Sequence, residues 1–283
     1  MPLYMDFHKI QNVTLDDVKS AHTADVSIQE KYGVKYHQYW VNQQEGTVFC
    51  LVEGPDAKTC EHVHQLAHGN LACAMTEVEP GSFTLFMGDK LKVDHGLTRS
   101  EYGEIDDGYR FVLVTAIRGI AGPGNSEGLH RLQIPHRAKE KVTGNINASG
   151  GRTKKWEADD TLIGVFNEAE DAIRCAEKIR EELQSEDKGQ VMFKIGITAD
   201  QPVTLNGEFF SRAVRMGRRL CTAAKDNQIL VSALASKLGM ATKVSNFVRF
   251  LDPPEEEFIF GLLDLTDHKL AQEDFSVASI CKD

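Results

Sequence analysis

The chain has 283 residues, of which 41% are apolar and 26% are charged, a composition that is ordinary for a folded globular protein. This excludes a disordered or collagen-like chain. Because 42 acidic residues outnumber 32 basic ones, the net charge of −10 argues against a surface that grips nucleic acid. No apolar run is long enough to cross a membrane, and the first residues lack the pattern of a signal peptide. We therefore expect a cytoplasmic protein with no membrane partner, whose six scattered cysteines stay reduced.

The first 80 residues alternate β-rich and helical patterns. A helix is predicted at residues 15–32, because Thr14 precedes an acidic first turn and Gly33 follows the last turn. Two β-rich runs joined by a short polar segment then indicate a hairpin. The order β-α-β-β-α-β predicts a ferredoxin-like fold. Its strands are expected at residues 3–8, 34–41, 47–52 and 74–78, and its second helix at residues 56–69.

The second half again alternates strands and helices. Residues 81–108 are rich in glycine and charge and predict a connector with one strand at residues 82–87, and residues 121–127 predict a polar loop. We expect an α+β protein of two ferredoxin-like domains, at residues 1–80 and 109–283. In the second domain the pattern predicts strands at residues 110–117, 161–166, 191–198 and 228–231, helices at residues 168–184 and 209–224, and a last helix that ends at residue 238.

Four residues of the first domain have the chemistry and the positions of metal ligands. His64 and His68 are four residues apart on one predicted helix, so their imidazoles lie on the same face. His22 lies on the inward stripe of the other helix, and Cys50 alternates with two valines of a strand and therefore points inward. Imidazole and thiolate ligands suit Ni, Zn, Cu or Fe better than Mg or Ca. We therefore predict a transition-metal site formed by His22, Cys50, His64 and His68.

Three further polar residues fall near this predicted site. Asp25 and Gln29 share the helical stripe of His22, and His8 ends the first strand. We expect these side chains to accept hydrogen bonds from the ligand imidazoles and to fix their tautomers. The alternative is a network of buried, hydrogen-bonded histidines that binds no ion, with Cys50 as a small buried apolar residue.

The same residues give the first domain a resemblance to a known family. It resembles a family of small ferredoxin-like domains described as nickel-binding, which also occur fused ahead of class III cyclase-like domains. This resemblance implies a transition-metal cofactor, with nickel first and zinc or copper as alternatives. The matching segments are Ala21-His22, Asp25, Gln29, Tyr32-Gly33-Val34, Tyr39-Trp40, Phe49-Cys50-Leu51-Val52, Pro55, Val63-His64 and Ala67-His68-Gly69.

A series of short segments, in a fixed order, covers most of residues 110–238. The segments are Val114-Thr115-Ala116-Ile117-Arg118-Gly119, Asp159-Asp160-Thr161, Lys194-Ile195-Gly196-Ile197, Gly207-Glu208-Phe209-Phe210, Val214-Arg215-Met216, Arg219-Leu220 and Gln228-Ile229-Leu230-Val231-Ser232. Through these segments the second half resembles the catalytic domain of class III nucleotidyl cyclases. In that family two aspartates bind two metal ions, and an Asn and an Arg on one helix orient the ribose and stabilise charge.

Two functional residues of the cyclase family are missing when its residues are matched to this sequence one by one. The first aspartate falls on Ala116 and the asparagine falls on Arg215, whereas Asp160 and Arg219 keep the second aspartate and the arginine. Glu208 takes the position that helps to read the purine. The resemblance therefore implies a cyclase-like domain without catalytic residues, a pseudoenzyme in which Asp160, Glu208, Arg215 and Arg219 remain as a remnant nucleotide site. Whether Mg²⁺ and a nucleotide still bind there stays open.

These observations lead to one main expectation and two alternatives. We expect a signalling protein that binds a transition metal, forms a homodimer and carries a degenerate cyclase domain as its regulatory or sensory module. In a homodimer each altered site would meet another altered site, so self-association would not restore cyclisation. The first alternative is an active class III nucleotidyl cyclase that uses ATP or GTP. The second is a purely structural homodimer without a ligand.

Overall fold

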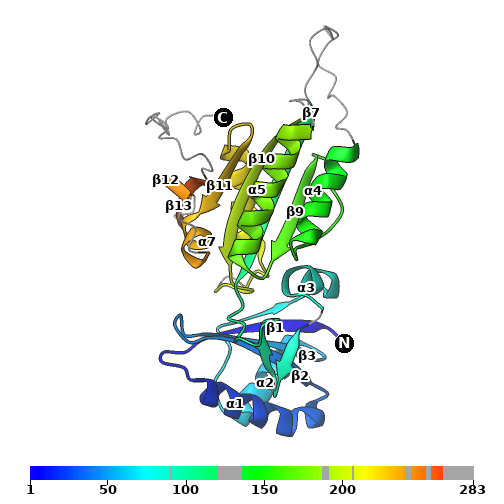
Figure 1. Cartoon of the computed structure of the whole chain (residues 1–283). Helices are drawn as coiled ribbons and strands as arrows, with labels where there is room; N and C mark the ends of the chain where they lie inside the picture. The colour runs from blue at the N-terminus through cyan, green and yellow to red at the C-terminus, as the bar shows by residue number, and fades with distance from the viewer. Residues whose placement is uncertain are drawn as a thin grey trace, which may run out of the picture.

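The computed structural model describes residues 1–89, 91–119, 136–186, 191–205, 207–239, 244–252 and 256–263. It consists of two α+β domains, each built on its own sheet (Figure 1). The loop predicted at residues 121–127 lies outside the described residues. None of the described helices is both long enough and apolar enough to cross a lipid bilayer.

The first domain has the predicted ferredoxin-like order. Four strands run in the order β4-β1-β3-β2, and both helices lie on the face of this sheet that is turned away from the second domain (Figure 1). Thr14 caps the first helix reciprocally with Asp17, which fixes where that helix begins. The elements are β1 (Leu3–Lys9), α1 (Leu15–Ile28), the 3-10 helix η1 (Gln29–Tyr32), β2 (Lys35–Asn42), β3 (Thr47–Glu53), α2 (Ala57–Ala67) and β4 (Ala74–Glu77).

The segment after β4 differs from its prediction. Residues 82–87 are not a strand but part of helix α3 (Pro80–Met87). Pro80 occupies the first turn, where its missing N–H costs nothing, and an apolar run this short does not separate strand from helix by its periodicity. The hairpin of β5 (Lys92–Asp94) and β6 (Leu97–Arg99) follows and joins the first sheet, because β6 pairs with β2 at Tyr39 and Leu97.

The second domain has a sheet in the order β12-β13-β11-β10-β7-β9-β8. Helices α4 and α5 pack against one face of this sheet, and α6 packs so closely on the other that the α6 backbone contacts Gly196 of β10. Helix α4 and strands β12 and β13 had no predicted counterpart. The elements are β7 (Arg110–Gly119), α4 (His136–Ala148), β8 (Arg152–Thr153), β9 (Thr161–Phe166), α5 (Ala169–Glu186), β10 (Val191–Asp200), α6 (Ser211–Ala223), β11 (Gln228–Ser232), α7 (Ala233–Leu238), β12 (Val244–Asp252) and β13 (Glu256–Leu263).

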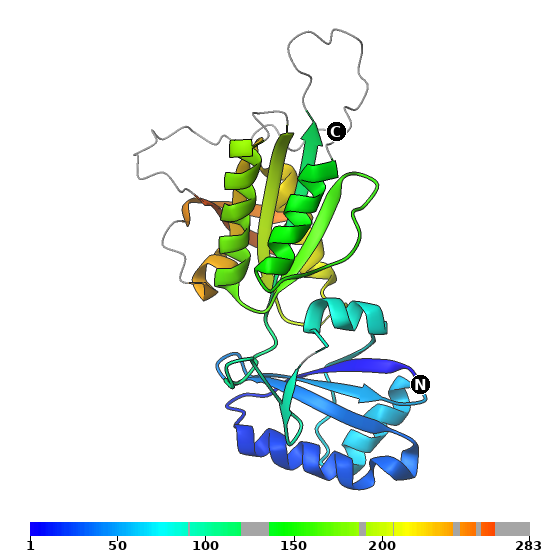
Figure 2. The ribbon, with the colours of Figure 1, turned by 45° about the vertical axis from the view of Figure 1, so that its right-hand side comes forward.

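The two domains share one hydrophobic core, with α3 between the two sheets (Figure 2). The face of the first sheet opposite its helices supplies apolar side chains, which meet α3 and the loop that precedes α6. Phe86 of α3 stacks on Phe210, with ring centroids 4.6 Å apart. From the first sheet this core contains Met5, Phe7, Trp40, Phe49 and Leu51.

Candidate metal centre

Strand β1 places two polar side chains on the helix side of the first sheet. Successive residues of a strand point to opposite faces, so Asp6 and His8 face the helices, whereas Met5 and Phe7 enter the core shared with the second domain. Asp6 has no exposed surface, and His8 is 5% exposed. Hence one face of β1 contributes to a polar cluster and the other to the contact between the domains.

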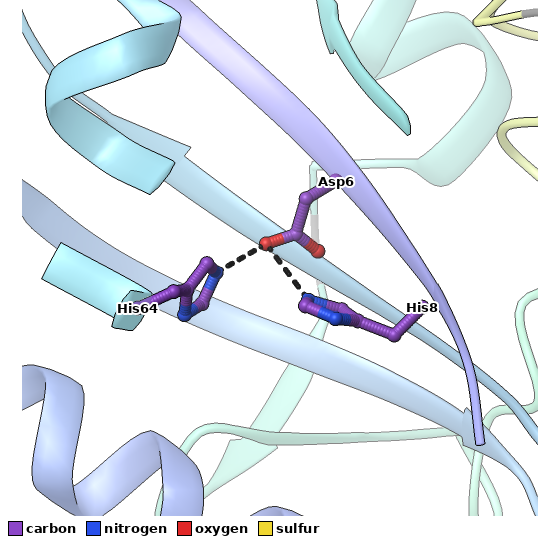
Figure 3. Close-up of side chains that lie close together, drawn as sticks. All are labelled: Asp6, His8 and His64. Carbon is purple, nitrogen blue, oxygen red and sulfur yellow. Dashed lines mark hydrogen bonds and ion pairs between the residues drawn. The ribbon is translucent and has the colours of Figure 1, made fainter. Parts of the chain in front are cut away.

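Asp6 forms the first of two polar groups that meet at His64. Its Oδ2 lies 2.7 Å from Nε2 of His64 on α2 and 3.5 Å from Nε2 of His8 (Figure 3). Its Oδ1 accepts a hydrogen bond of 2.6 Å from the backbone N–H of Cys50 on β3. The carboxylate is thereby fixed by residues of three different elements.

The second group lies on the other ring nitrogen of His64. Its Nδ1 is 3.1 Å from Oδ2 of Asp25 on α1 and 3.1 Å from Nε2 of His68. The same Nε2 of His68 is 3.2 Å from Oδ2 of Asp25. Thus three donor atoms, two imidazole nitrogens and one carboxylate oxygen, lie at nearly equal distances from one another.

Burial and charge shape the protonation of this cluster. Burial alone would lower the pKa of His64, but its hydrogen bonds with Asp25 and Asp6 outweigh burial and raise the pKa to about 10. Burial alone would raise the pKa of both aspartates, yet the neighbouring imidazoles reverse this effect, and the pKa of each is lowered. Without an ion, His64 is therefore an imidazolium between two carboxylates.

A cavity of about 260 Å³ adjoins the second group. Asp25, His64 and His68 all line it, and so do His22 and Cys50. Nδ1 of His22 is buried and has no hydrogen-bond partner among the described residues. Burial lowers the pKa of His22, and burial together with the carboxylates of Asp6 and Asp25 raises the pKa of the Cys50 thiol well above its usual range. His22 is therefore a neutral imidazole, and Cys50 is a protonated thiol.

The structure places some of the predicted site residues in the two groups of donor atoms and others outside these groups. His64 and His68 share one group with Asp25, and His8 belongs to the group of Asp6. His22 and Cys50 lie on the wall of the cavity, outside both groups. The side chain of Gln29 accepts a hydrogen bond from the backbone N–H of Tyr36 at 2.7 Å and does not line the cavity.

Sequence reasoning missed Asp6, which lies at the centre of the cluster. A signal was present in the β1 pattern, because an aspartate between Tyr4 and His8 occupies an inward position of a buried strand. A buried carboxylate is costly unless it is paired, so this position demanded partners.

Three of the remnant residues of the second domain, Asp160, Glu208 and Arg215, form ion pairs. Ala116 of β7 pairs with Thr161 of β9. Next to it, Asp160 has a left-handed backbone (φ 62°) and its Oδ1 lies 2.7 Å from Nζ of Lys139 on α4. On the other face, Arg215 of α6 lies 3.4 Å from Glu208. Arg219 is on the same helix, one turn after Arg215.

The two halves of the chain match different groups of known proteins. The family model described as nickel responsive protein SCO4226-like matches residues 4–78. The crystal structure of SCO4226 from Streptomyces coelicolor A3(2) is 35% identical, and the match covers 27% of this chain and 94% of that protein, with a TM-score of 0.26. Through its first domain, the chain belongs to the SCO4226-like family. No curated protein matches the chain.

The part of the chain beyond the SCO4226-like domain is similar to solved cyclase domains. An adenylate/guanylate cyclase/hydrolase from Silicibacter pomeroyi is 20% identical over 55% of this chain and 96% of that one, with a TM-score of 0.42. Adenylate cyclases from Trypanosoma brucei in their monomeric state are 13% identical over 55% of this chain and 89% of theirs, also with a TM-score of 0.42. We refer to this part as the cyclase-like domain.

Proposed function

We propose that the SCO4226-like domain binds one transition-metal ion through Asp25, His64 and His68, and that the ion regulates the contact between the two domains. The observation that carries this proposal is the spacing of three donor atoms, Nδ1 of His64, Nε2 of His68 and Oδ2 of Asp25, at 3.1, 3.1 and 3.2 Å. Imidazole and carboxylate donors bind such ions at about 2.0–2.2 Å, which separates neighbouring donors by roughly 3.0–3.4 Å. The donors are therefore spaced as ligands of one ion are.

The chemistry of the donor set fits the same proposal. Two imidazoles and one carboxylate suit nickel, zinc or copper, and the description of the family as nickel-responsive supports nickel. An ion held there would supply positive charge next to two buried carboxylates, Asp6 and Asp25, whose partners in the cluster are imidazoles and the Cys50 amide.

Asp6 has a separate role in this proposal. If Nδ1 of His64 binds an ion, Nε2 carries the ring proton, and this N–H donates a hydrogen bond to Oδ2 of Asp6 at 2.7 Å. Metal-binding histidines usually donate their second ring N–H to a carboxylate, which fixes both the tautomer and the ring orientation. Asp6 is therefore a positioning residue, and His8 contacts the same carboxylate oxygen.

The cyclase-like domain completes the proposal as a regulated module without cyclase activity. Ala116 has no carboxylate to hold a metal ion, and Arg215 brings a cation to a position where the family has an amide. The remaining carboxylate, Asp160, is ion-paired with Lys139. An ammonium thus already occupies the position next to the one acidic residue that a catalytic metal would need.

Strand β1 provides a physical connection between the ion and the domain contact. Asp6 and the apolar residue Phe7 are neighbours on opposite faces of β1, and Phe7 stacks on Phe49 within the shared core. A change in the charge of the cluster therefore acts on the strand that also supports α3 and the cyclase-like domain. We propose that metal occupancy shifts the equilibrium between tighter and looser packing of this core.

Nickel titration of the full chain tests the metal site. We expect wild type to bind one Ni²⁺ and His64→Gln and His68→Gln to lose at least tenfold in affinity, as measured by calorimetry and elemental analysis. His62→Gln is the matched control, because His62 is exposed on the same helix and contacts Tyr32 instead. No uptake by wild type, or equal losses in His62→Gln and His68→Gln, would contradict the assignment.

Hydrogen exchange measured with and without Ni²⁺ tests the regulatory part. We expect nickel to change the protection of β1 and α3 in wild type, and to leave it unchanged in His68→Gln. A nickel effect confined to α1 and α2 would mean that the ion is local to the SCO4226-like domain and does not regulate the domain contact.

A further inference from the structure

One side of helix α1 forms a wall of the cavity beside the donor cluster. Asp17, Ala21 and Asp25 are spaced four residues apart, so they lie in one row along the helix, and all three line the cavity of about 260 Å³. Exposure falls along this row, because Asp17 is exposed, Ala21 is half-buried and Asp25 is only 2% exposed. The cavity therefore extends from the surface of the domain to buried donor residues.

The cavity reaches the second group of donor atoms and not the first. Asp25, His64 and His68 all line it, whereas Asp6 does not line it and has no exposed surface. His64 is itself only 1% exposed, and the far face of the first sheet is covered by the core shared with the second domain. Donors that are buried to this degree need an entry path for their ion.

The charges along the cavity favour a cation. The carboxylates of Asp17 and Asp25 line it, and none of its described lining residues is a lysine or an arginine. Oδ2 of Asp17 accepts hydrogen bonds from the hydroxyl group and the backbone N–H of Thr14, at 2.6 and 3.1 Å. These hydrogen bonds lower the pKa of Asp17, so its carboxylate is ionised at neutral pH. A charged group at the opening of a cavity raises the local concentration of ions of opposite sign.

We propose that the ion reaches its three donor residues through this cavity, and that Asp17 attracts it at the mouth. This inference rests on the proposed metal site and adds the route by which the site is loaded. Asp17 precedes Asp25 by eight residues, or about 12 Å along the helix at 1.5 Å per residue, so it is not a ligand of the bound ion. Because this distance exceeds the Debye length of about 8 Å at physiological ionic strength, the charge of Asp17 acts on the approach of the ion and little on the bound ion.

Stopped-flow mixing of the full chain with Ni²⁺ and a metal indicator tests the role of Asp17. Asp17→Asn should lower the association rate constant at least twofold at an ionic strength of about 0.01 M, and the difference should vanish near 1 M, because the Debye length falls from about 30 Å to about 3 Å. Asp16→Asn is the matched control, since Asp16 is in the same turn of α1 but does not line the cavity. An unchanged rate constant in Asp17→Asn, or equal losses in the two variants, would overturn this role.

A bulkier side chain at residue 21 tests the route itself. Ala21→Phe should lower the association and the dissociation rate constants of Ni²⁺ at least tenfold each and change the affinity far less, because it narrows the path and removes no donor. Ala24→Phe is the control, since Ala24 is also half-buried on α1 but does not line the cavity.

The outcomes separate the route from the proposed function. Equal rate constants in Ala21→Phe and Ala24→Phe would overturn the route and leave the metal site standing. A loss of affinity in Ala21→Phe with unchanged association would mean that residue 21 acts on the bound ion, which also overturns the route. No nickel uptake by wild type would overturn the metal site and this inference with it.

Discussion

Asp6 illustrates how one buried residue determines the chemistry around it. Its carboxylate has no exposed surface, yet its two oxygens are satisfied by His64, by His8 and by the Cys50 amide. A buried charge persists only where such partners exist, so the carboxylate and its imidazoles stabilise one another. The arrangement also selects which nitrogen of His64 faces α1.

Replacing Asp6 by asparagine keeps the shape and removes the charge. We expect Asp6→Asn to lose about 10–100-fold in nickel affinity, because His64 loses the acceptor that orients it. We also expect a loss of about 1–3 kcal/mol in the free energy of unfolding of the metal-free chain, since a buried group loses a charged partner. Urea unfolding and nickel titration measure the two effects. Asp16→Asn, at an exposed position of α1, is the control and should change neither quantity comparably.

The raised pKa of His64 makes stability depend on pH in a defined direction. A pKa raised from 6.5 to about 10 means that the folded state holds this proton more tightly, so the stabilisation is complete below pH 6.5 and is lost as the pH rises towards 10. The lowered pKa of Asp6 and Asp25 acts oppositely, with stabilisation that is present above about pH 4 and is lost below it.

Two measurements check this dependence. The first is the difference in unfolding free energy between metal-free wild type and His64→Gln. This difference should be larger at pH 6 than at pH 9.5 by at least about 1 kcal/mol, because one unit of pKa shift corresponds to about 1.4 kcal/mol. Nickel affinity should rise over the same interval, because the ion must displace the proton from His64. A constant difference between the two proteins would mean that folding does not change the pKa of His64.

Among the elements, α3 depends on groups supplied by the cyclase-like domain. Its last turn leaves carbonyl groups without helical partners, and two guanidinium groups satisfy them. Arg152 donates to the carbonyls of Leu85 and Phe86 at 2.8 and 2.7 Å, and Arg110 donates to the carbonyl of Phe86 at 3.1 Å. Cations at this end of a helix also interact favourably with its dipole. Helix α3 is thereby fixed to the cyclase-like domain.

Substitution of Arg152 should loosen this attachment. We expect Arg152→Leu to cost about 1–3 kcal/mol in unfolding free energy, because the Leu85 carbonyl and Asn167 lose their donor and the Phe86 carbonyl keeps only Arg110. Arg174→Leu is the control, since Arg174 forms an exposed ion pair with Asp171 of a kind worth about 0–1 kcal/mol. Equal midpoints of chemical unfolding for the two variants would show that the helix is held by its apolar contacts alone.

Helix α3 is an element whose secondary structure could not be predicted from the sequence, unlike most of the others. Most strands and helices with a clear period were predicted within a few residues, and β9 was predicted at its observed bounds. Helix α3 was predicted as a strand, because its apolar side chains face both domains and show no single periodic face. Asp6 was missed for a related reason, since its partners lie 44 and 58 residues away and local pattern carries no information on such contacts.

At the scale of the whole molecule, the two domains share a core but differ in how their polar sites are completed. In the SCO4226-like domain, donor atoms converge on one point beside a cavity, at the spacing of metal ligands. In the cyclase-like domain, the acidic residue that matches the family is paired with a lysine, and Arg215 and Glu208 face each other. This contrast is the reason why we propose ion binding for the first domain and a response to the ion for the second.

The proposed lack of cyclase activity is the prediction that is simplest to measure. We expect no cyclic nucleotide from the full chain with ATP or GTP in the presence of Mg²⁺ or Mn²⁺, with or without Ni²⁺. Two-metal catalysis needs carboxylates that bind both ions. Here one of the two family positions is Ala116, which has no carboxylate, and the other is Asp160, which forms an ion pair with Lys139. Ala116→Asp combined with Lys139→Ala and Arg215→Asn would restore the family's residues and remove the Lys139 ammonium from Asp160. A low activity is expected from this variant. Product formed by wild type and abolished in Asp160→Asn would instead establish an active cyclase, in which Lys139 must leave Asp160 before metal binds.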